Sequence, residues 1–182
     1  MRETVIPFHS IFRGPQIVTK IPEGMCNPDT APRRIGPADP TLAQVLALIR
    51  TAFAGMDGRI DPPSSMHRLT QDDLAAPGVE VWAVGAPPVA CVVLTPQADT
   101  LYLGKLAVAG PARGRGFARI LTDHATDRAR ALGLPGVTLQ VRVELTENQA
   151  TFTRLGFVEV GRTAHPGYDR PTSITYRRPV TP

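Results

Sequence analysis

The chain has 182 residues, 42% of them hydrophobic, and a formal net charge of +4 from 20 Lys and Arg against 16 Asp and Glu. This length suits one domain with a sizeable core, and the small charge excess argues against a protein that coats nucleic acid. No apolar run approaches the roughly 20 residues of a membrane span, and two cysteines are too few for a disulfide framework or a cysteine-built metal site.

Residues 1–30 differ from the rest of the chain, because prolines and glycines interrupt them and no clean hydrophobic period runs through them. We expect an N-terminal extension that either adds an edge strand or wraps the domain formed by residues 31–182. The chain start lacks the apolar core of a secretory signal, so we expect a cytoplasmic protein.

The first half of the domain predicts one helix followed by an antiparallel meander. Arg33 to Ile35 form a short strand, and a helix capped by Asp39 or Thr41 has apolar residues at helical spacing, namely Leu42, Val45, Leu46, Ile49 and Phe53. Residues 55–70 form a loop, and a short helix starts at Thr70. Short turns separate three strand-like runs, which are Val79–Val84, Pro88–Thr95 and Thr100–Val108.

The second half predicts a helix, a strand, a helix and a hairpin. The first helix starts after residue 116 and ends near Gly133. Its apolar stripe consists of Phe117, Ile120, Leu121, His124, Ala125 and Leu132, and we expect His124 to be a core histidine. A strand, a short helix capped by Thr146 and two final strands follow in the segments "GVTLQVRV", "TENQATFTRL", "FVEVGRT" and "PTSITYRR". These elements predict a mixed α/β arrangement in layers.

The segment "VAGPARGRGFAR", residues 108–119, joins a strand to a helix through a turn rich in glycine and arginine. The first turn of a helix has unpaired N–H groups and a partial positive charge, and glycines let the backbone approach a ligand closely. The pattern therefore indicates an anion site. It lacks the Lys-Ser or Lys-Thr of a Walker loop, and Arg119 stands where a dinucleotide fingerprint needs its third glycine.

This turn resembles the acyl-coenzyme A loop of the GNAT superfamily of N-acetyltransferases. Arg113, Gly116 and Ala118 fill its Arg/Gln-x-x-Gly-x-Gly/Ala signature, and "ENQATFTRLGF" resembles the later helix-plus-strand element of the family. The resemblance extends from Arg33 to Arg178. It implies an α/β fold with a mostly antiparallel sheet of about seven strands, splayed between two parallel central strands and flanked by about four helices.

The resemblance also implies acetyl-CoA as the co-substrate. Main-chain amides of residues 106–108 would polarise the thioester carbonyl, and those of 113–118 would hold the pyrophosphate. Many members carry a tyrosine that protonates the leaving thiolate where this chain has Phe152. The expected coenzyme-binding residues are Leu106, Ala107, Val108, Arg113, Gly114, Arg115, Gly116, Phe117, Ala118, Arg119, Asn148 and Phe152.

The acceptor amine must be neutral to attack, so a base or a water relay is needed. Glu144 and Tyr102 are the expected catalytic residues, with Glu147 and His67 as further candidates for the base; an exposed strand-end carboxylate is the plainer explanation of Glu144. For the acceptor site we expect Asp57, Arg59 and Tyr168, which otherwise are solvated turn residues.

The leading hypothesis is an N-acetyltransferase that moves an acetyl group from acetyl-CoA directly to a primary amine in a ternary complex. The acceptor is a small molecule or a peptide, and its identity stays open. The alternative is a catalytically silent acyl-CoA-binding or regulatory module, which Phe152 favours. We expect no nucleic acid partner, no membrane partner and no metal, and nucleic-acid binding ranks last among the hypotheses. A homodimer is left open because many relatives are dimers.

Overall fold

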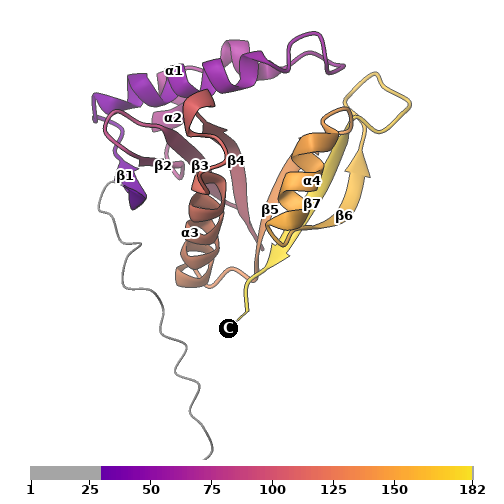
Figure 1. The fold of residues 1–182 in the computed structure, drawn as a ribbon. Coiled ribbons are helices and arrows are strands. Elements are labelled where there is room, and N and C mark those ends of the chain that lie inside the picture. Colours follow the sequence, from indigo (N-terminus) through magenta and orange to yellow (C-terminus); the bar gives the residue numbers. More distant parts are fainter. Residues whose placement is uncertain (1–29, 182) are drawn as a thin grey trace, which may run out of the picture.

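The computed structural model describes residues 30–181, so the expected N-terminal extension lies almost wholly outside the described residues (Figure 1). The elements in chain order are β1 (Arg33–Ile35), α1 (Thr41–Ala54), η2 (Ser65–Arg68), α2 (Gln71–Ala75), β2 (Glu80–Val84), β3 (Ala90–Pro96), β4 (Leu101–Val108), η3 (Gly110–Ala112), α3 (Phe117–Ala131), β5 (Gly136–Arg142), α4 (Thr146–Arg154), β6 (Val158–Thr163) and β7 (Ser173–Pro179). Among the described residues no helix is long and apolar enough to cross a membrane.

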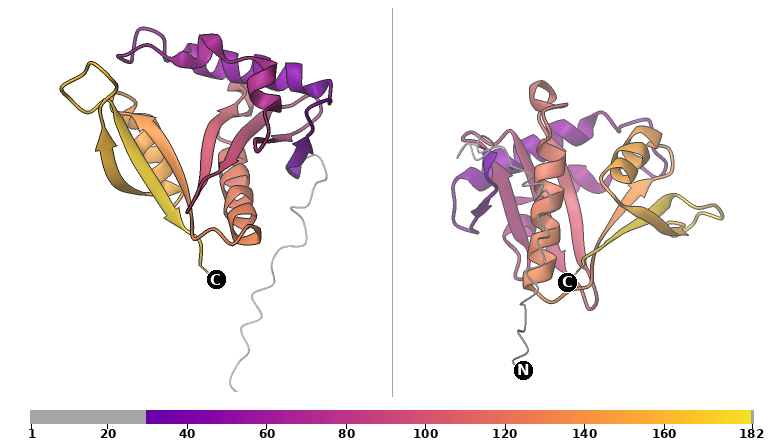
Figure 2. Two further views of the ribbon diagram at one scale, coloured as in Figure 1. Left: turned by 180° about the vertical axis from the view of Figure 1, so that it is seen from behind. Right: turned by 60° about the horizontal axis from the view of Figure 1, so that its bottom comes forward.

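The strands form one seven-stranded sheet in the order β1-β2-β3-β4-β5-β7-β6. Its one parallel pair is β4 and β5, which stay in register only at Leu101–Val137 and Tyr102–Thr138. Beyond these residues the two strands diverge, as the views in Figures 1 and 2 show. The predicted fold class is confirmed, including the splay between two parallel central strands.

The two sides of the sheet carry separate apolar cores. Strand β3 illustrates the division, since successive side chains of a strand point to opposite faces. Cys91 and Val93 pack with α1 and α2, whereas Val92 and Leu94 pack with α3. The core on the α3 side also includes residues of β5 and β7 and therefore joins the two halves of the splayed sheet.

Local signals account for some helix ends. Pro40 is the N-cap of α1 and makes no side-chain cap bond, so the predicted cap at Asp39 or Thr41 was wrong. Thr70 caps α2 through a reciprocal pair of hydrogen bonds with Asp73, and Gly133 follows α3 with a left-handed φ of +69°. Thr146 is the first residue of α4 rather than its cap, so that prediction was wrong by one position.

The predicted apolar stripe of α3 was partly wrong. Phe117 and Leu121 are buried, but Leu132 is 38% exposed because the helix ends before it. Thr122 and Thr126 are buried in its place, and Thr126 satisfies its hydroxyl by donating to the Thr122 carbonyl. The buried face of α3 therefore contains two threonines, which a search for apolar residues alone does not find.

Candidate active site

The turn between η3 and α3 presents a row of free main-chain donors. Gly114 and Gly116 adopt φ values of +74° and +86°, which glycine reaches without strain. Within the described part of the chain, the N–H groups of residues 114–119 donate to no protein acceptor; the first bonded N–H of the helix is that of Ile120, to Gly116 O. Such a row of unpaired donors can receive an anion.

Arginine side chains surround this turn and keep their charge available. Arg113, Arg115 and Arg119 are exposed, and none forms an ion pair with a carboxylate among residues 30–181. Arg115 lies over the buried Phe117 ring, 5.4 Å from its centroid, which holds the guanidinium beside the turn. The predicted arginines and glycines thus lie together as one cationic cradle, residues 113–119.

The edge of β4 that faces β5 leads away from this cradle. Ala109 N–H donates to Val89 O on the β3 side, and N–H groups along a strand alternate between its two edges. The N–H group of Val108 therefore faces β5, which no longer pairs with β4 at this level. This donor is open to a ligand that runs from the cradle into the splay.

A β-bulge interrupts β4 at the same level. Cys91 pairs with Ala107 and Val93 with Gly104, so Lys105 and Leu106 together oppose the single residue Val92. Lys105 has a φ of +50°, the one non-glycine positive φ among the described residues, and such a conformation costs about 1–3 kcal/mol. Burial lowers the pKa of its ammonium, while Asp73 raises it. No local pattern in the sequence pointed to this residue.

The remaining predicted coenzyme residues lie on α4, across the splay. Asn148 is half-buried and its side chain bonds to no protein group in the described residues. Phe152 packs edge-to-face against Phe157 with 5.7 Å between ring centroids. Phe152 therefore belongs to the edge of the α3-side core as well as to the splay.

Tyr102 lies where the splay begins, in the last paired position of β4. Burial raises the pKa of its phenol above the ordinary value, so the phenol stays protonated at neutral pH. This environment suits proton donation better than proton abstraction.

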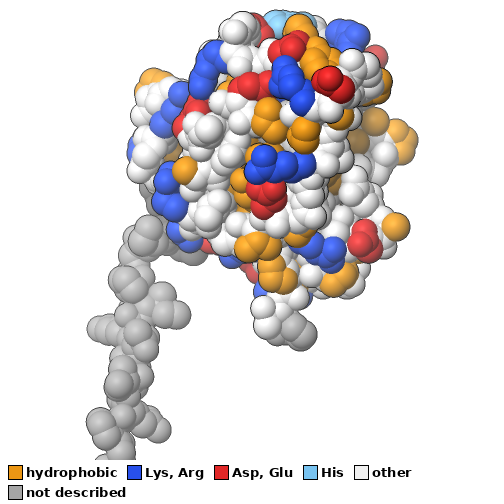
Figure 3. Space-filling view, turned by 90° about the vertical axis from the view of Figure 1, so that its right-hand side faces the viewer, with side chains coloured by type: hydrophobic (Ala, Val, Ile, Leu, Met, Phe, Trp, Pro, Cys, Tyr) orange, Lys and Arg blue, Asp and Glu red, His pale blue; other side chains and the backbone are white. Residues whose placement is uncertain are grey.

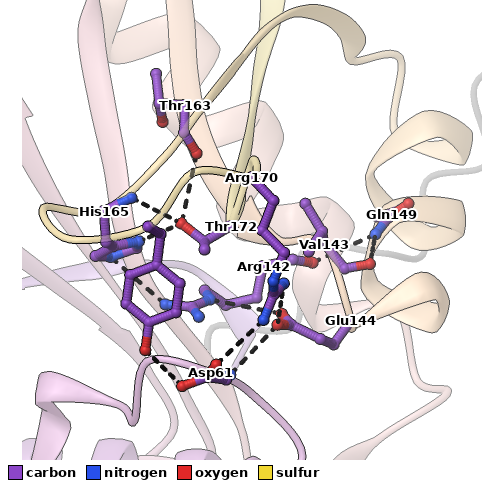
Figure 4. A network of polar contacts seen from close by, with 10 residues as sticks. Asp61, Arg142, Val143, Glu144, Gln149, Thr163, His165, Arg170 and Thr172 are labelled. Atoms are coloured by element: carbon purple, nitrogen blue, oxygen red, sulfur yellow. Dashed lines mark hydrogen bonds and ion pairs between the residues drawn. The ribbon is translucent and has the colours of Figure 1, made fainter.

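Glu144 lies just beyond β5, in the network of polar contacts shown in Figure 4. Its Oε1 accepts the N–H of Asp61 at 3.3 Å, and its Oε2 is 3.7 Å from Nε of Arg142. Asp61 in turn accepts hydrogen bonds from the Tyr168 hydroxyl and from Arg170. The loop of residues 55–64 and the β6–β7 loop thus meet above the end of β5.

The other predicted acceptor residues are engaged with protein partners. Arg59 pairs with Glu147 of α4. The backbone hydrogen bond of Glu147 and, after it, the contact with Arg59 lower the pKa of this carboxyl. The lowered pKa makes Glu147 a poor base. Asp57 pairs with His67 at 3.0 Å, and both line a hollow of about 300 Å³ with Arg50, Phe53, Ala54 and Met66.

Sequence reasoning had not singled out Arg142, His165 or Arg170, because the first lies within a strand pattern and the others within a turn.

The sequence profile of the acetyltransferase (GNAT) family matches residues 44–157. No curated protein matches the chain significantly in sequence. The matched segment contains the bulged strand, the cradle and α4.

Solved structures share this fold at low sequence identity. An aminoglycoside 6'-acetyltransferase type Ii is similar with a TM-score of 0.66 and 19% identity, over 83% of this chain and 97% of the other. A GNAT-family acetyltransferase from Staphylococcus aureus gives 0.61 and 16%, over 83% and 100%. A chain of the NatC complex bound to Gag peptide and CoA gives 0.58 and 19%, over 83% and 98%.

Proposed function

The chain belongs to the acetyltransferase (GNAT) family, and on that premise we propose that it transfers an acetyl group from acetyl-CoA directly to a primary amine within one ternary complex. The observations that carry the proposal are the unpaired N–H groups of residues 114–119 and the edge of β4 near its bulge, which β5 no longer pairs with. Direct transfer requires both substrates in one opening, and the splay is bordered by candidate groups for each.

The cradle fits the diphosphate of acetyl-CoA. Six free N–H groups at a helix start, together with three unpaired guanidinium groups, match a group with several negative charges. Farther along β4, the N–H of Leu106 would donate to the thioester carbonyl oxygen and stabilise the negative charge that develops there. Asn148 would bond the pantetheine arm from the opposite side.

Glu144 is the residue we assign as the base. It is partly buried beside the end of β5, and Oε2 has no hydrogen-bond partner among the described residues. An unengaged carboxylate oxygen can take a proton from the acceptor ammonium, directly or through a water. Tyr102 is the weaker choice, because burial raises its pKa.

Phe152 has no proton to give to the departing thiolate. A thiol with an ordinary pKa near ~8.5 is a tolerable leaving group at neutral pH, so the sulfur leaves as thiolate without help from this position. Phe152 instead presents its ring to the splay while it packs on Phe157.

Two measurements on the purified chain test the proposal. Calorimetry should detect acetyl-CoA binding, and an assay of free thiol should detect CoA release with members of a library of primary amines. Binding without thiol release from any amine would favour the silent acyl-CoA-binding module. Absence of binding would contradict both functions.

A further inference from the structure

Arg142 of β5 has one edge engaged and one edge free. Its Nη1 is 3.4 Å from Nε2 of His165. Because arginine offers only donors, this His165 nitrogen accepts, and Nδ1 carries the hydrogen donated to Thr172 Oγ1. Nε and Nη2 of Arg142 are buried and have no hydrogen-bond partner within the described residues.

The free edge is the one through which two other arginines of this protein bind carboxylates, whereas Arg33, Arg130 and Arg178 use Nη1. Arg128 binds Glu80 through Nε and Nη2, and Arg162 binds Glu159 through the same pair of atoms. Two parallel N–H groups fit the two oxygens of a carboxylate. Arg142 therefore presents a carboxylate fork that forms no hydrogen bond in the described residues, although its Nε makes a long ion pair of 3.7 Å with Glu144.

Glu144 faces this fork but does not fill it. Its Oε2 forms an ion pair with Nε of Arg142 at 3.7 Å, beyond hydrogen-bond distance, and this buried oxygen has no hydrogen-bond partner among the described residues. Buried polar groups are rarely left unbonded, since each costs about 1–3 kcal/mol. Two donors and one acceptor are thus left without hydrogen bonds in the described residues, and Figure 4 shows Arg142 and Glu144 side by side in the network.

The fork lies at the level where transfer would occur. Counting five residues along each strand from the pair Leu101–Val137 brings Leu106 of β4 close to the level of Arg142. Val137, Leu139 and Val141 of β5 point into the α3-side core, so Arg142 lies on the opposite face. An acceptor whose carboxylate binds this fork would therefore have its amine near Leu106, where the thioester of acetyl-CoA would lie.

The charges above the fork balance one another. Asp61 and Glu144 face Arg170, with contacts of 3.1 Å and 4.0 Å, and cationic and anionic side chains intermingle over the side of the molecule drawn in Figure 3. Such a surface has no preference for a purely cationic amine, whereas it suits a molecule that carries both charges. The contacts of Asp61 with Tyr168 and Arg170 must open to admit it, because the free atoms of Arg142 are closed off from solvent.

We infer that the acceptor is a zwitterion of the α-amino-acid type, with its carboxylate on Nε and Nη2 of Arg142 and its amine on Oε2 of Glu144. This inference rests on the proposed function and narrows its acceptor to amines that carry an adjacent carboxylate. Arg142 is then the residue that determines specificity, and His165 positions it.

Matched ligands test the inference. Protein saturated with CoA is titrated by calorimetry with the twenty common amino acids and with the corresponding α-carboxamides, which keep the amine and side chain but lose the charged oxygens. The preferred acid should bind about 10- to 100-fold more tightly than its amide, as expected for a charge-assisted hydrogen-bonded pair. Equal affinity for acid and amide, or no binding of any acid, would overturn the inference.

A conservative variant separates the fork from the charge. Arg142→Lys keeps the charge but loses the two parallel N–H groups, so the preference for the acid over its amide should fall at least about 10-fold while the amide is unaffected. Arg162→Lys on the exposed edge of β6 is the matched control and should leave the preference intact. A preference for the acid that is undiminished in Arg142→Lys would overturn the assignment. Binding of CoA is measured in the same calorimeter cell. A loss of coenzyme binding, which would contradict the proposed function, is therefore distinguished from a loss of acceptor binding.

Discussion

Gly116 combines two requirements in one residue. Its φ of +86° favours glycine, and an added side chain would meet no atom within 4 Å, so a larger residue can be accommodated sterically. The same position lies among the free N–H groups of the cradle. Its chemistry can therefore be changed with a modest effect on folding, of about 1–3 kcal/mol.

We predict that Gly116→Asp removes acetyl-CoA binding while the fold persists. Like charges about 4 Å apart repel by about 4 kcal/mol at an effective dielectric constant near 20, so affinity should fall by at least about 100-fold. Calorimetry gives the affinity and circular dichroism the fold. Gly78→Asp is the control, because Gly78 has a similar φ of +80° and open space far along the chain from the cradle. Full affinity in Gly116→Asp would refute the cradle.

At the scale of elements, one buried ion pair ties β2 to α3. Glu80 is only 6% exposed, and its carboxylate receives Nε and Nη2 of Arg128 and the indole N–H of Trp82. Glu159 and Arg162 make a similar fork, but both are exposed on β6. The two pairs differ in burial rather than in geometry.

Glu80→Gln should therefore lower the free energy of unfolding by about 2–3 kcal/mol, because it leaves Arg128 without its counter-charge in a partly buried site. Glu159→Gln should change it little, since water screens an exposed pair. Urea unfolding of both variants measures the difference. Equal losses would mean that burial does not set the strength of these pairs.

At the scale of the whole molecule, stability should depend on pH through groups of the α3 side. His124 packs on Trp82 with 4.1 Å between ring centroids. Burial lowers its pKa, with a smaller contribution from Arg128, whereas Asp127 and Glu80 raise it. The hydrogen bond from Arg128 is the largest cause of the lowered pKa of Glu80.

The pKa values of His124 and Glu80 are both lowered in the folded protein. A lowered folded-state pKa means that the unfolded chain binds the proton more readily, so stability falls as pH falls. The free energy of unfolding should decline first below about pH 6.5 as His124 titrates and again below about pH 4.5 as Glu80 titrates. Urea unfolding across pH 4 to 8 tests this. His124→Gln should abolish the first decline, and an unchanged curve in that variant would exclude His124 as its source.

The sequence by itself determined the elements and the cradle. Hydrophobic period, turn residues and capping act over a few neighbouring positions, so the strands of the meander, the course of α3 and the Arg113–Arg119 turn were all predictable. The donors of the cradle are likewise neighbours in the chain, and their chemistry is local.

Only the tertiary structure decided which side chains meet around the splay. Asp61 meets Glu144 across 83 positions and Tyr168 across 107, and the strain at Lys105 exists because β3 and β4 pair with one residue out of step. The free fork of Arg142 depends in turn on where His165 and Glu144 come to rest. Such contacts arise from strand register and loop closure, which no short window of sequence encodes, because they depend on the packing of the whole chain.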